Sequence, residues 1–361
     1  MSNEIRIENY ILKEKIGEGG FATVYKGYKI WDDQNIAQYY AIKKIDQSAK
    51  KIGTEVETLA NEKLKVSDDK TENLGICQEI IEDRIKCEKY FILKLYNGGD
   101  LKQYIQNQKN KPLKIEEIIH IMKNILNGLT VLHKNLIFHS DIKPANLMVN
   151  YDNKEDLIKK HLLKSKIVII DLGCASMHIN NEKTESNFIK GTKLYMHPKL
   201  IESNNNLKEE KDIWSLGLVC LELFTGDLNK HYDRENGIYK IPLNENTSVE
   251  LVRFIDKMLQ YESNNQANLE QLMNEPFLIN PSLNLFKKEY AGDKLEIIEN
   301  KSFLKLNYKN GYNFDYDKLD KLLKNKRDED EELNGLINKL FIELNENFLF
   351  TEPVLIPVIP K

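Results

Sequence analysis

Residues 212–226, DIWSLGLVCLELFTG, would form a helix with almost no polar side. Such a helix has to lie inside a large core. A second helix is predicted at residues 114–132, where apolar side chains recur at helical spacing just after Pro112. A chain of 361 residues is long enough to bury such a core, and its length favours two lobes or a domain with an appendage.

The front of the chain has a different pattern. Residues 10–28 and 39–45 alternate apolar and polar side chains around glycines, which predicts strands joined by a glycine-rich turn. The run KIVIID at residues 166–171 predicts a short buried strand that ends at Asp171. A strand-rich front and a helix-rich back place the chain in the α+β class, with charged turns where the two parts meet.

The overall composition excludes several classes of protein. The formal charge is −4 and charges of both signs are interspersed, so we expect no nucleic-acid partner and no anionic membrane surface. Four cysteines without metal-type spacing suit a reducing compartment. The start of the chain has no secretory signal, and the longest apolar run, residues 214–225, is too short to span a bilayer. We expect an intracellular protein, cytoplasmic, with the nucleus left open as an alternative.

Four short stretches carry residues suited to phosphate chemistry. Gly17 and Gly19 stand in a turn, where the lack of a side chain lets the backbone N–H groups come close to phosphate oxygens. Lys43 follows on an apolar strand, and HSDIKPAN at residues 139–146 gathers an imidazole, a carboxylate, an ammonium and an amide. Asp171 stands at the end of a strand, well placed to hold a divalent cation. Each stretch alone has an ordinary explanation, such as a hairpin turn or a solvated lysine, but the four together favour one site.

With these residues the chain resembles the eukaryotic protein kinase family, from Gly17 to about Phe277. The motifs are GxGxxxxV at 17–24, AIKK at 41–44, LYNGGDL at 95–101, HxDxKxxN at 139–146, DxG at 171–173, GTKLYMHPK at 191–199 and DIWSLG at 212–217. The resemblance implies a two-lobed protein-kinase-like fold, with a small antiparallel β-sheet N-lobe carrying one main helix and a larger, mainly helical C-lobe. We place the kinase domain at residues 1–281, with the N-lobe at about 1–95 and the C-lobe at about 96–281. Residues 282–361 would be a C-terminal extension of unknown role, helical in part.

The resemblance implies a protein serine/threonine kinase that transfers the γ-phosphate of ATP to hydroxyls of protein substrates with magnesium. Asp141 would accept or orient the substrate hydroxyl proton, and Lys143 would steady the γ-phosphate. Asn146 and Asp171 would hold the magnesium ions. Lys143 and Thr192 both match the serine/threonine branch, since tyrosine-specific relatives have different residues after the catalytic aspartate.

By the same resemblance Lys43 would contact the α- and β-phosphates, oriented by a carboxylate from the helix that follows. That helix is predicted at residues 54–66, and Glu55 and Glu62 fall on one of its faces. From the family's usual spacing we choose Glu62 as the partner of Lys43. Glu55, two turns earlier on the same face, is the alternative.

The remaining nucleotide contacts also come from the resemblance. Leu93 would be the gatekeeper beside the adenine, and Asp100 would bind the ribose, although capping a surface helix is almost as strong an interpretation. Asp212 would brace the catalytic loop from below. The complete predicted nucleotide site is Gly17, Gly19, Val24, Ala41, Lys43, Glu62, Leu93, Leu95, Asp100, Asn146 and Asp171.

Two departures from the family pattern carry information. Ser140 stands where the family usually has an arginine that pairs with a phosphorylated activation-loop residue, and a serine offers no cationic fork. We therefore expect that activity does not depend strongly on phosphorylation at Thr184 or Ser186. Lys199 replaces a glutamate whose usual arginine partner aligns with Gln266. Because both ends have changed, we expect a substituted contact rather than a damaged fold.

Hypotheses of other classes stay open beside the kinase. A pseudokinase scaffold would bind nucleotide or a partner without catalysis, but the residues it usually lacks are all present here. The C-terminal extension could dock a partner protein or pack on the kinase domain itself. Residues 150–166 are longer than the family's usual link, which predicts either a small surface helix or a docking site.

Overall fold

A computed structural model of the protein describes residues 5–19, 22–30, 38–46, 51–69, 72–179, 182–183, 191–203, 207–243, 247–279, 295–298 and 301–307. The chain divides into two compact units, residues 1–219 and 220–361. The lobe boundary expected near residue 95 falls inside the first unit. The predicted C-terminal helix near Leu336 and the proline-rich tail lie outside the described residues.

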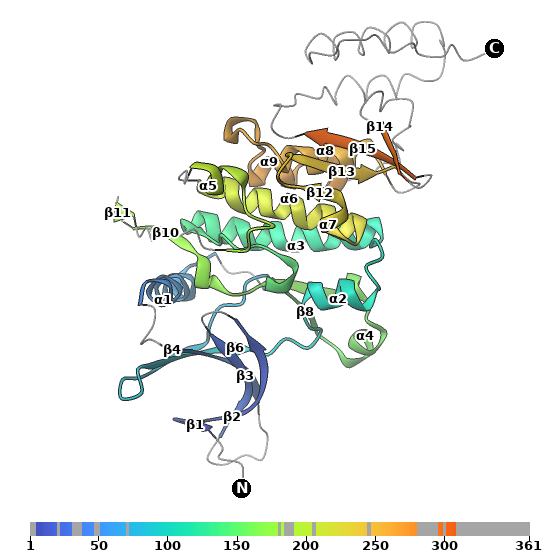
Figure 1. The fold of residues 1–361 in the computed structure, drawn as a ribbon. Helices are drawn as coiled ribbons and strands as arrows, with labels where there is room; N and C mark the ends of the chain where they lie inside the picture. Colours follow the sequence, from blue (N-terminus) through green and yellow to red (C-terminus); the bar gives the residue numbers. More distant parts are fainter. Residues whose placement is uncertain are drawn as a thin grey trace, which may run out of the picture. The chain divides into compact units, whose positions relative to one another are not determined.

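The first unit begins with a six-stranded antiparallel sheet in the order β1-β2-β3-β4-β6-β5 (Figure 1). Its strands are β1 Ile5–Ile7, β2 Tyr10–Glu18, β3 Thr23–Lys29, β4 Tyr39–Asp46, β5 Glu79–Asp83 and β6 Glu88–Lys94. The alternating pattern around the glycine-rich turn therefore forms the predicted strands. This sheet is the small antiparallel N-lobe expected from the sequence.

The two faces of the sheet have different partners because successive side chains point to opposite sides. Tyr25, Ile42 and Ile92 are opposite one another in register and belong to an apolar cluster on one face. Val24, Lys43 and Phe91 are opposite one another on the other face. The alternation thus places an ammonium on the same face as apolar side chains, which is the face the predicted nucleotide site needs.

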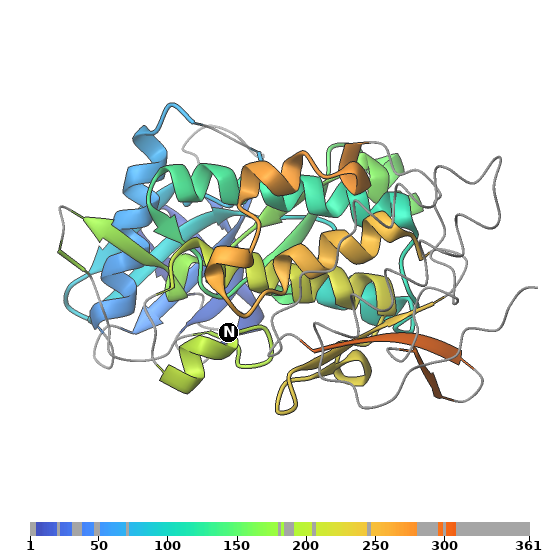
Figure 2. The ribbon, with the colours of Figure 1, turned by 90° about the horizontal axis from the view of Figure 1, so that it is seen from above.

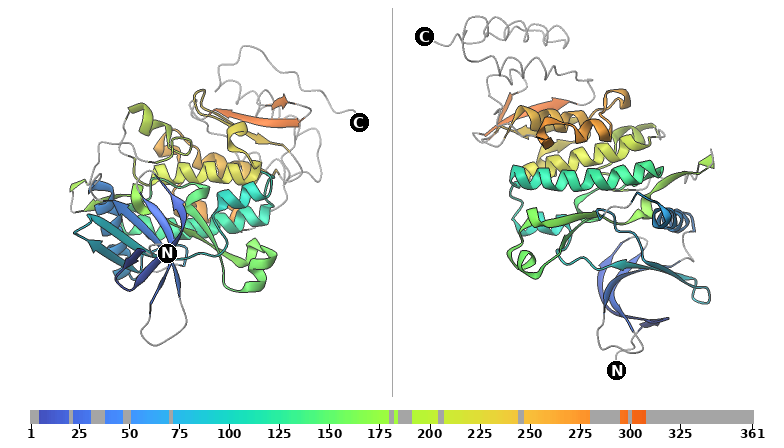
Figure 3. Two further views of the ribbon diagram at one scale, coloured as in Figure 1. Left: turned by 60° about the horizontal axis from the view of Figure 1, so that its bottom comes forward. Right: turned by 180° about the vertical axis from the view of Figure 1, so that it is seen from behind.

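Helix α1, Lys51–Val66, is the main helix beside this sheet (Figure 3). It packs against the short helical turn η3, Leu172–Cys174, which directly follows Asp171. Asn61 fixes the helix to the chain that enters the sheet, because its Oδ1 accepts a hydrogen bond of 2.8 Å from the Cys77 backbone nitrogen. The helix is therefore tied both to the sheet and to the turn beside the metal-binding aspartate predicted from the sequence.

The helical part of the first unit contains α2 Leu101–Asn107, α3 Ile115–Lys134, α4 Lys154–Lys159, α5 Pro198–Ser203 and α6 Glu209–Thr225, the last of which continues into the second unit. The predicted helix at 114–132 is α3, and its apolar face is buried along its whole length. Helix α6 is the predicted apolar helix, and its Trp214 is completely buried. The surface helix α4 accounts for the unusually long link at residues 150–166.

Short strands bring the loops of the first unit together. They are β7 Ile137–Phe138, β8 Leu147–Tyr151, β9 Ser165–Ile169, β10 Ser176–Ile179 and β11 Glu182–Lys183. Strand β7 pairs with β10, and β8 pairs with β9. Since β7 leads into residues 139–146 and β9 leads into Asp171, these two pairings bring the chemical motifs side by side.

The second unit contains α7 Leu228–His231, α8 Val249–Met258, α9 Leu269–Met273 and α10 Pro276–Ile279, with strands β12 Tyr232–Asp233, β13 Ile238–Pro242, β14 Leu295–Ile298 and β15 Lys301–Asn307. These strands form a sheet in the order β12-β13-β15-β14 (Figure 2). Strands β14 and β15 lie beyond residue 281, in the extension expected to be helical in part. Pairing of β15 with β13 joins the start of that extension to a strand of the predicted kinase domain.

Among the described residues, no helix combines the length and the hydropathy needed to span a bilayer.

Candidate active site

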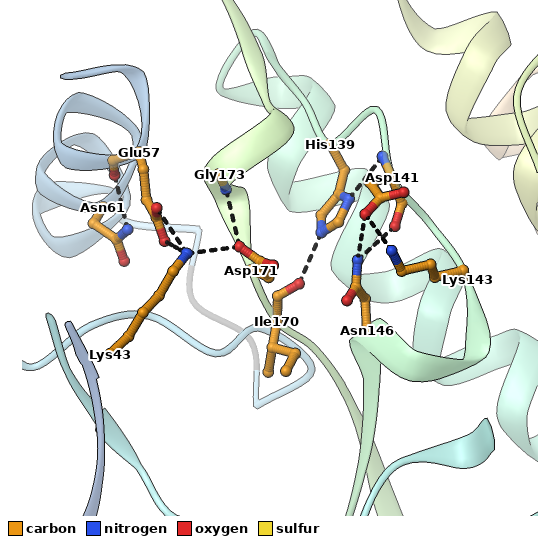
Figure 4. A network of polar contacts seen from close by, with 10 residues as sticks. All are labelled: Lys43, Glu57, Asn61, His139, Asp141, Lys143, Asn146, Ile170, Asp171 and Gly173. Carbon is orange, nitrogen blue, oxygen red and sulfur yellow. Dashed lines mark hydrogen bonds and ion pairs between the residues drawn. The ribbon is translucent and has the colours of Figure 1, made fainter. Parts of the chain in front are cut away.

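Lys43 on β4 is the first anchor of the candidate site. Its Nζ donates hydrogen bonds to both carboxylate oxygens of Glu57, at 2.6 and 2.8 Å, and to Oδ1 of Asp171 at 2.7 Å (Figure 4). Lys43 and Glu57 are both buried, so this is an ion pair with little access to water. Burial alone would lower the pKa of Lys43, but the two carboxylates outweigh it and hold that pKa above its ordinary value. The ammonium is therefore permanently charged and fixed between two elements.

The partner of Lys43 predicted from the sequence was wrong. Glu62 and its alternative Glu55 both lie on the exposed face of α1, beside Leu59, which is 41% exposed. They share one face as predicted, but that face points to solvent. Glu57 is 4% exposed and lies on the buried side of the helix, where Leu64 follows it at i+7. The apolar spacing from Glu57 is the signal that would have identified it.

Asp171 lies in a left-handed backbone conformation with φ of 70°. Its Oδ1 also accepts a hydrogen bond of 3.2 Å from the Gly173 backbone nitrogen, while 44% of its side chain stays exposed. Desolvation opposes ionisation of this carboxyl, but the Lys43 ammonium prevails and lowers the pKa of Asp171 to about 2. Asp171 therefore presents an ionised carboxylate to solvent, as a cation ligand must.

Asp141 is the centre of the second cluster. Its Oδ2 accepts hydrogen bonds from Lys143 Nζ at 2.7 Å and from Asn146 Nδ2 at 3.0 Å. Its Oδ1 accepts one from the Thr192 backbone nitrogen at 2.8 Å. Lys143 Nζ also donates to Thr192 Oγ1 at 2.6 Å. Both oxygens of this buried carboxylate are thus oriented, and the three residues predicted from HSDIKPAN do converge.

Asp212, completely buried, holds the loop that carries Asp141. It accepts hydrogen bonds from the backbone nitrogens of His139 at 2.8 Å and Ser140 at 2.7 Å, and from His133 Nε2 at 2.9 Å. Although burial would raise the pKa of Asp212, the hydrogen bond and charge of His133 and the nearby Lys211 hold it below its ordinary value. These contacts agree with the bracing role predicted for Asp212, because its carboxylate binds the backbone of the loop and is not exposed to a substrate.

Ile170 joins the two clusters through its backbone. Its nitrogen donates to the carbonyl oxygen of Asn146 at 3.0 Å, and its carbonyl oxygen accepts from His139 Nε2 at 2.9 Å. His139 Nδ1 in turn accepts a hydrogen bond of 3.3 Å from the Asp141 nitrogen. The residue before Asp171 is therefore bound at both ends by the loop that carries Asp141. The role of His139 was not predicted, because an interaction with backbone leaves no motif of its own.

Gly191 allows the chain to approach this loop closely. Its φ is 116°, and a Cβ added there would lie 2.6 Å from the Ser140 carbonyl oxygen. Only glycine fits both the conformation and the space. This close approach puts the next residue, Thr192, against Asp141 and Lys143.

The other predicted nucleotide contacts lie on the sheet face that carries Lys43. Gly17 is opposite Val24 in register, and Ala41 is opposite Leu93. Leu95 follows directly after β6 and is half-buried. A half-exposed apolar surface beside an ammonium suits a flat heteroaromatic base joined to phosphates.

Some predicted residues have other contacts. Asp100 is the N-cap of α2, because its Oδ1 accepts a hydrogen bond of 2.8 Å from the Gln103 nitrogen, so the capping interpretation is confirmed and a ribose contact stays a prediction. Gly19 closes a turn by donating from its nitrogen to the Ala22 carbonyl oxygen at 2.9 Å. Gln266 Nε2 donates to the Met258 carbonyl oxygen at 2.7 Å within the second unit.

Asp171 and Asn146 are the two residues predicted to hold a divalent cation. Asn146 uses its Nδ2 for the Asp141 carbonyl and carboxylate, which leaves its amide oxygen as the atom that could face a cation. No cluster of three or more histidine, cysteine, aspartate or glutamate side chains suited to a metal occurs among the described residues. One carboxylate and one amide oxygen would hold Mg²⁺ that takes its other ligands from water and phosphates.

The Lys43–Glu57 pair predicts a non-additive effect on stability. Lys43→Met leaves a buried carboxylate without its counter-charge, so we expect the free energy of unfolding to fall by about 3–5 kcal/mol in urea denaturation. Lys43→Met with Glu57→Leu removes both charges and should restore most of that loss. Glu62→Gln is the matched control and should change stability by less than about 0.5 kcal/mol. A larger effect from Glu62→Gln than from a Glu57 substitution would contradict this assignment.

Comparison with known proteins agrees with this geometry. The family model described as "Protein kinase domain" matches residues 10–278. The chain is 27% identical to serine/threonine-protein kinase atg1 of Dictyostelium discoideum over 76% of its own length, and 28% identical to serine/threonine-protein kinase TIO of Arabidopsis thaliana over 75%. It is 26% identical to serine/threonine-protein kinase PLK4 of Drosophila virilis over 76% of its length. It spans only 40%, 19% and 33% of those three relatives in turn. The chain belongs to the protein kinase family.

Proposed function

We propose that this protein transfers the γ-phosphate of ATP to serine or threonine hydroxyls of protein substrates, with magnesium as the metal. The observation that carries the proposal is the connection of Lys43, Asp171 and Asp141 into one hydrogen-bonded network through Ile170 and His139. Phosphoryl transfer depends on positioning and on neutralising charge more than on covalent catalysis. A network that fixes one ammonium and two carboxylates supplies both.

The charge of each residue sets the role that we propose for it. Lys43, held by Glu57, would bind the α- and β-phosphates, and Lys143 would bind the γ-phosphate. Asp141 would orient the acceptor hydroxyl and take its proton as the oxygen attacks phosphorus. Because both oxygens of Asp141 are already held by neighbours, its approach to the hydroxyl would need little reorganisation.

The magnesium ion would be held by Asp171 and Asn146. Mg²⁺ bound there would neutralise phosphate charge and fix the direction of the β- and γ-phosphates. The low pKa of Asp171, about 2, supports this role because the carboxylate stays ionised throughout the physiological pH range. Asp171 needs no proton loss before it binds the cation.

The choice of serine or threonine over tyrosine is supported by the contact between Lys143 and Thr192. This contact holds the chain that follows Gly191 close to Asp141.

An intracellular location stays a prediction from the sequence. All four cysteines are free thiols, which supports a reducing compartment. Desolvation raises the pKa of Cys77 to about 11, so this thiol stays protonated and unreactive.

Asp141→Asn is expected to abolish phosphoryl transfer while leaving nucleotide binding intact. The amide cannot accept the hydroxyl proton, so the rate constant should fall by about 10²–10⁴. Transfer to a generic protein substrate and calorimetric titration with Mg·ATP measure the two properties separately. Asp152→Asn, at the distant end of the β8–β9 hairpin, is the matched control. Unmodified protein that binds Mg·ATP but transfers no phosphate would instead establish the pseudokinase alternative.

Replacing Thr184 and Ser186 together by alanine should leave most activity intact. Ser140 has no cation to pair with a phosphate, and its Oγ instead donates to the Phe138 carbonyl oxygen at 3.1 Å. Both positions lie outside the described residues, so the test is kinetic. We expect kcat of the double variant within about threefold of the unmodified protein, since no charge-assisted contact is lost. Loss of activity in this variant would contradict the role given to Ser140.

We also propose that the C-terminal extension packs on its own domain rather than serving only to dock a partner. The pairing of β15 with β13 supports this, because removing residues 282–361 would expose the edge of β13 next to the buried Tyr239 and Ile241. The chain ending at Pro281 should therefore unfold at lower temperature or aggregate. Unchanged stability and activity with altered location in the cell would favour partner docking instead.

A further inference from the structure

Lys211 is a buried lysine that the proposed chemistry does not use. It lies in the first turn of α6, directly before Asp212, and is 9% exposed. Its Nζ donates a hydrogen bond of 2.7 Å to Ser176 Oγ and lies 5.7 Å from the centre of the Phe138 ring. The hydrogen bond goes to a neutral hydroxyl rather than to a carboxylate. Burial lowers the pKa of Lys211, although Asp212 and Glu210 act in the opposite direction.

The two partners of Lys211 belong to the strands that join the two halves of the site. Ser176 is the first residue of β10, the strand that follows Asp171, and Phe138 is the last residue of β7, directly before His139. The two residues are opposite each other in register. The ladder has only one further pair, Met177 with Ile137. A ladder this short has little stability of its own, so a side chain that contacts both strands stabilises their pairing.

We propose that Lys211 is a positioning residue for phosphoryl transfer, a fixed internal cation that holds the segment after Asp171 against the strand that leads to Asp141. The proposal rests on the function proposed above. The ammonium binds one strand through the Ser176 hydroxyl and the other through the Phe138 ring, and cation–π contacts of this kind strengthen when water is excluded. Asp212 holds the loop after Phe138 through two backbone nitrogens. Neighbouring residues of α6 thus fix both sides of the β7–β10 pair.

The chemistry of the position argues against simple core filling. Removing an ammonium from water costs several kcal/mol, and within the part of the chain that the structure describes no carboxylate accepts a hydrogen bond from Lys211 to offset it. An unbranched apolar side chain such as methionine would fill similar space without that penalty. The lysine is therefore less favourable for stability than an apolar residue, and its advantage has to lie in the two directed contacts. Because the cation is part of the chain, the strands are held without any modification of the protein.

Four variants test the proposal. In Lys211→Met we expect kcat to fall by about tenfold, because a small misplacement of reacting groups is enough for such a loss. KM for ATP should change less than about twofold, since Lys43 and Glu57 keep their contacts, and the unfolding temperature should be unchanged or higher. Lys211→Arg keeps a cation and donors and should retain most of kcat. Ser176→Ala should lower kcat less than Lys211→Met does, and the double variant should match Lys211→Met alone.

Hydrogen exchange provides a readout that does not need activity. The Ser176 and Met177 amides should exchange faster in Lys211→Met than in the unmodified protein. Lys208→Met, at an exposed lysine just before the same helix, is the matched control and should change neither exchange nor kcat. Wild-type kcat in Lys211→Met, equal losses in the arginine and methionine variants, or unchanged exchange would each overturn the proposal. If the unmodified protein transfers no phosphate, the proposed function fails. The hydrogen-exchange measurement still tests by itself whether Lys211 holds the two strands together.

Discussion

The hydrogen bonds on the backbone of Ile170 are the constraint on which the site depends. They come from Asn146 and His139, at the two ends of one loop, and they hold the residue directly before Asp171. A side chain can change rotamer, but a backbone bound at both its nitrogen and its oxygen has little freedom. The position of Asp171 relative to Asp141 is therefore constrained by these two hydrogen bonds and by the covalent bond between Ile170 and Asp171.

Lys43 adds a second constraint of a different kind. Its ammonium joins a strand, a helix and the turn at Asp171 by charge. The pair with Glu57 is buried and the contact with Asp171 is half-exposed, so the second is the weaker of the two. In the proposed function, this difference would let Lys43 keep its contact with the helix while its contact with Asp171 gives way to phosphate oxygens.

The sequence predicted the parts of the site that lie in contiguous motifs. Asp141, Lys143 and Asn146 converge because they lie within six residues of one loop, and the strand and helix patterns follow from periodicity. The prediction failed at Glu57, because Glu62 had the spacing usual in the family but lies on the exposed face of the helix, and only burial distinguishes the two faces. It could not identify His139 or Lys211, whose partners are a carbonyl, a hydroxyl and a ring on segments far away in the chain. Strand β15 was missed because its partner β13 lies far earlier in the chain, and β14 was missed with it because β14 joins the sheet only through its pairing with β15.

The two ends of the β8–β9 hairpin differ in how well they would tolerate a change in chain length. Leu147 is opposite Ile169 at the end that enters the site, and Tyr151 is opposite Ser165 at the other end, where α4 has been inserted. The residue pairs between these two ends separate the α4 end from Asn146 and Asp171. For protein engineering, the α4 turn is accordingly the place where a reporter or an affinity handle can be built into the chain without disturbing the chemistry.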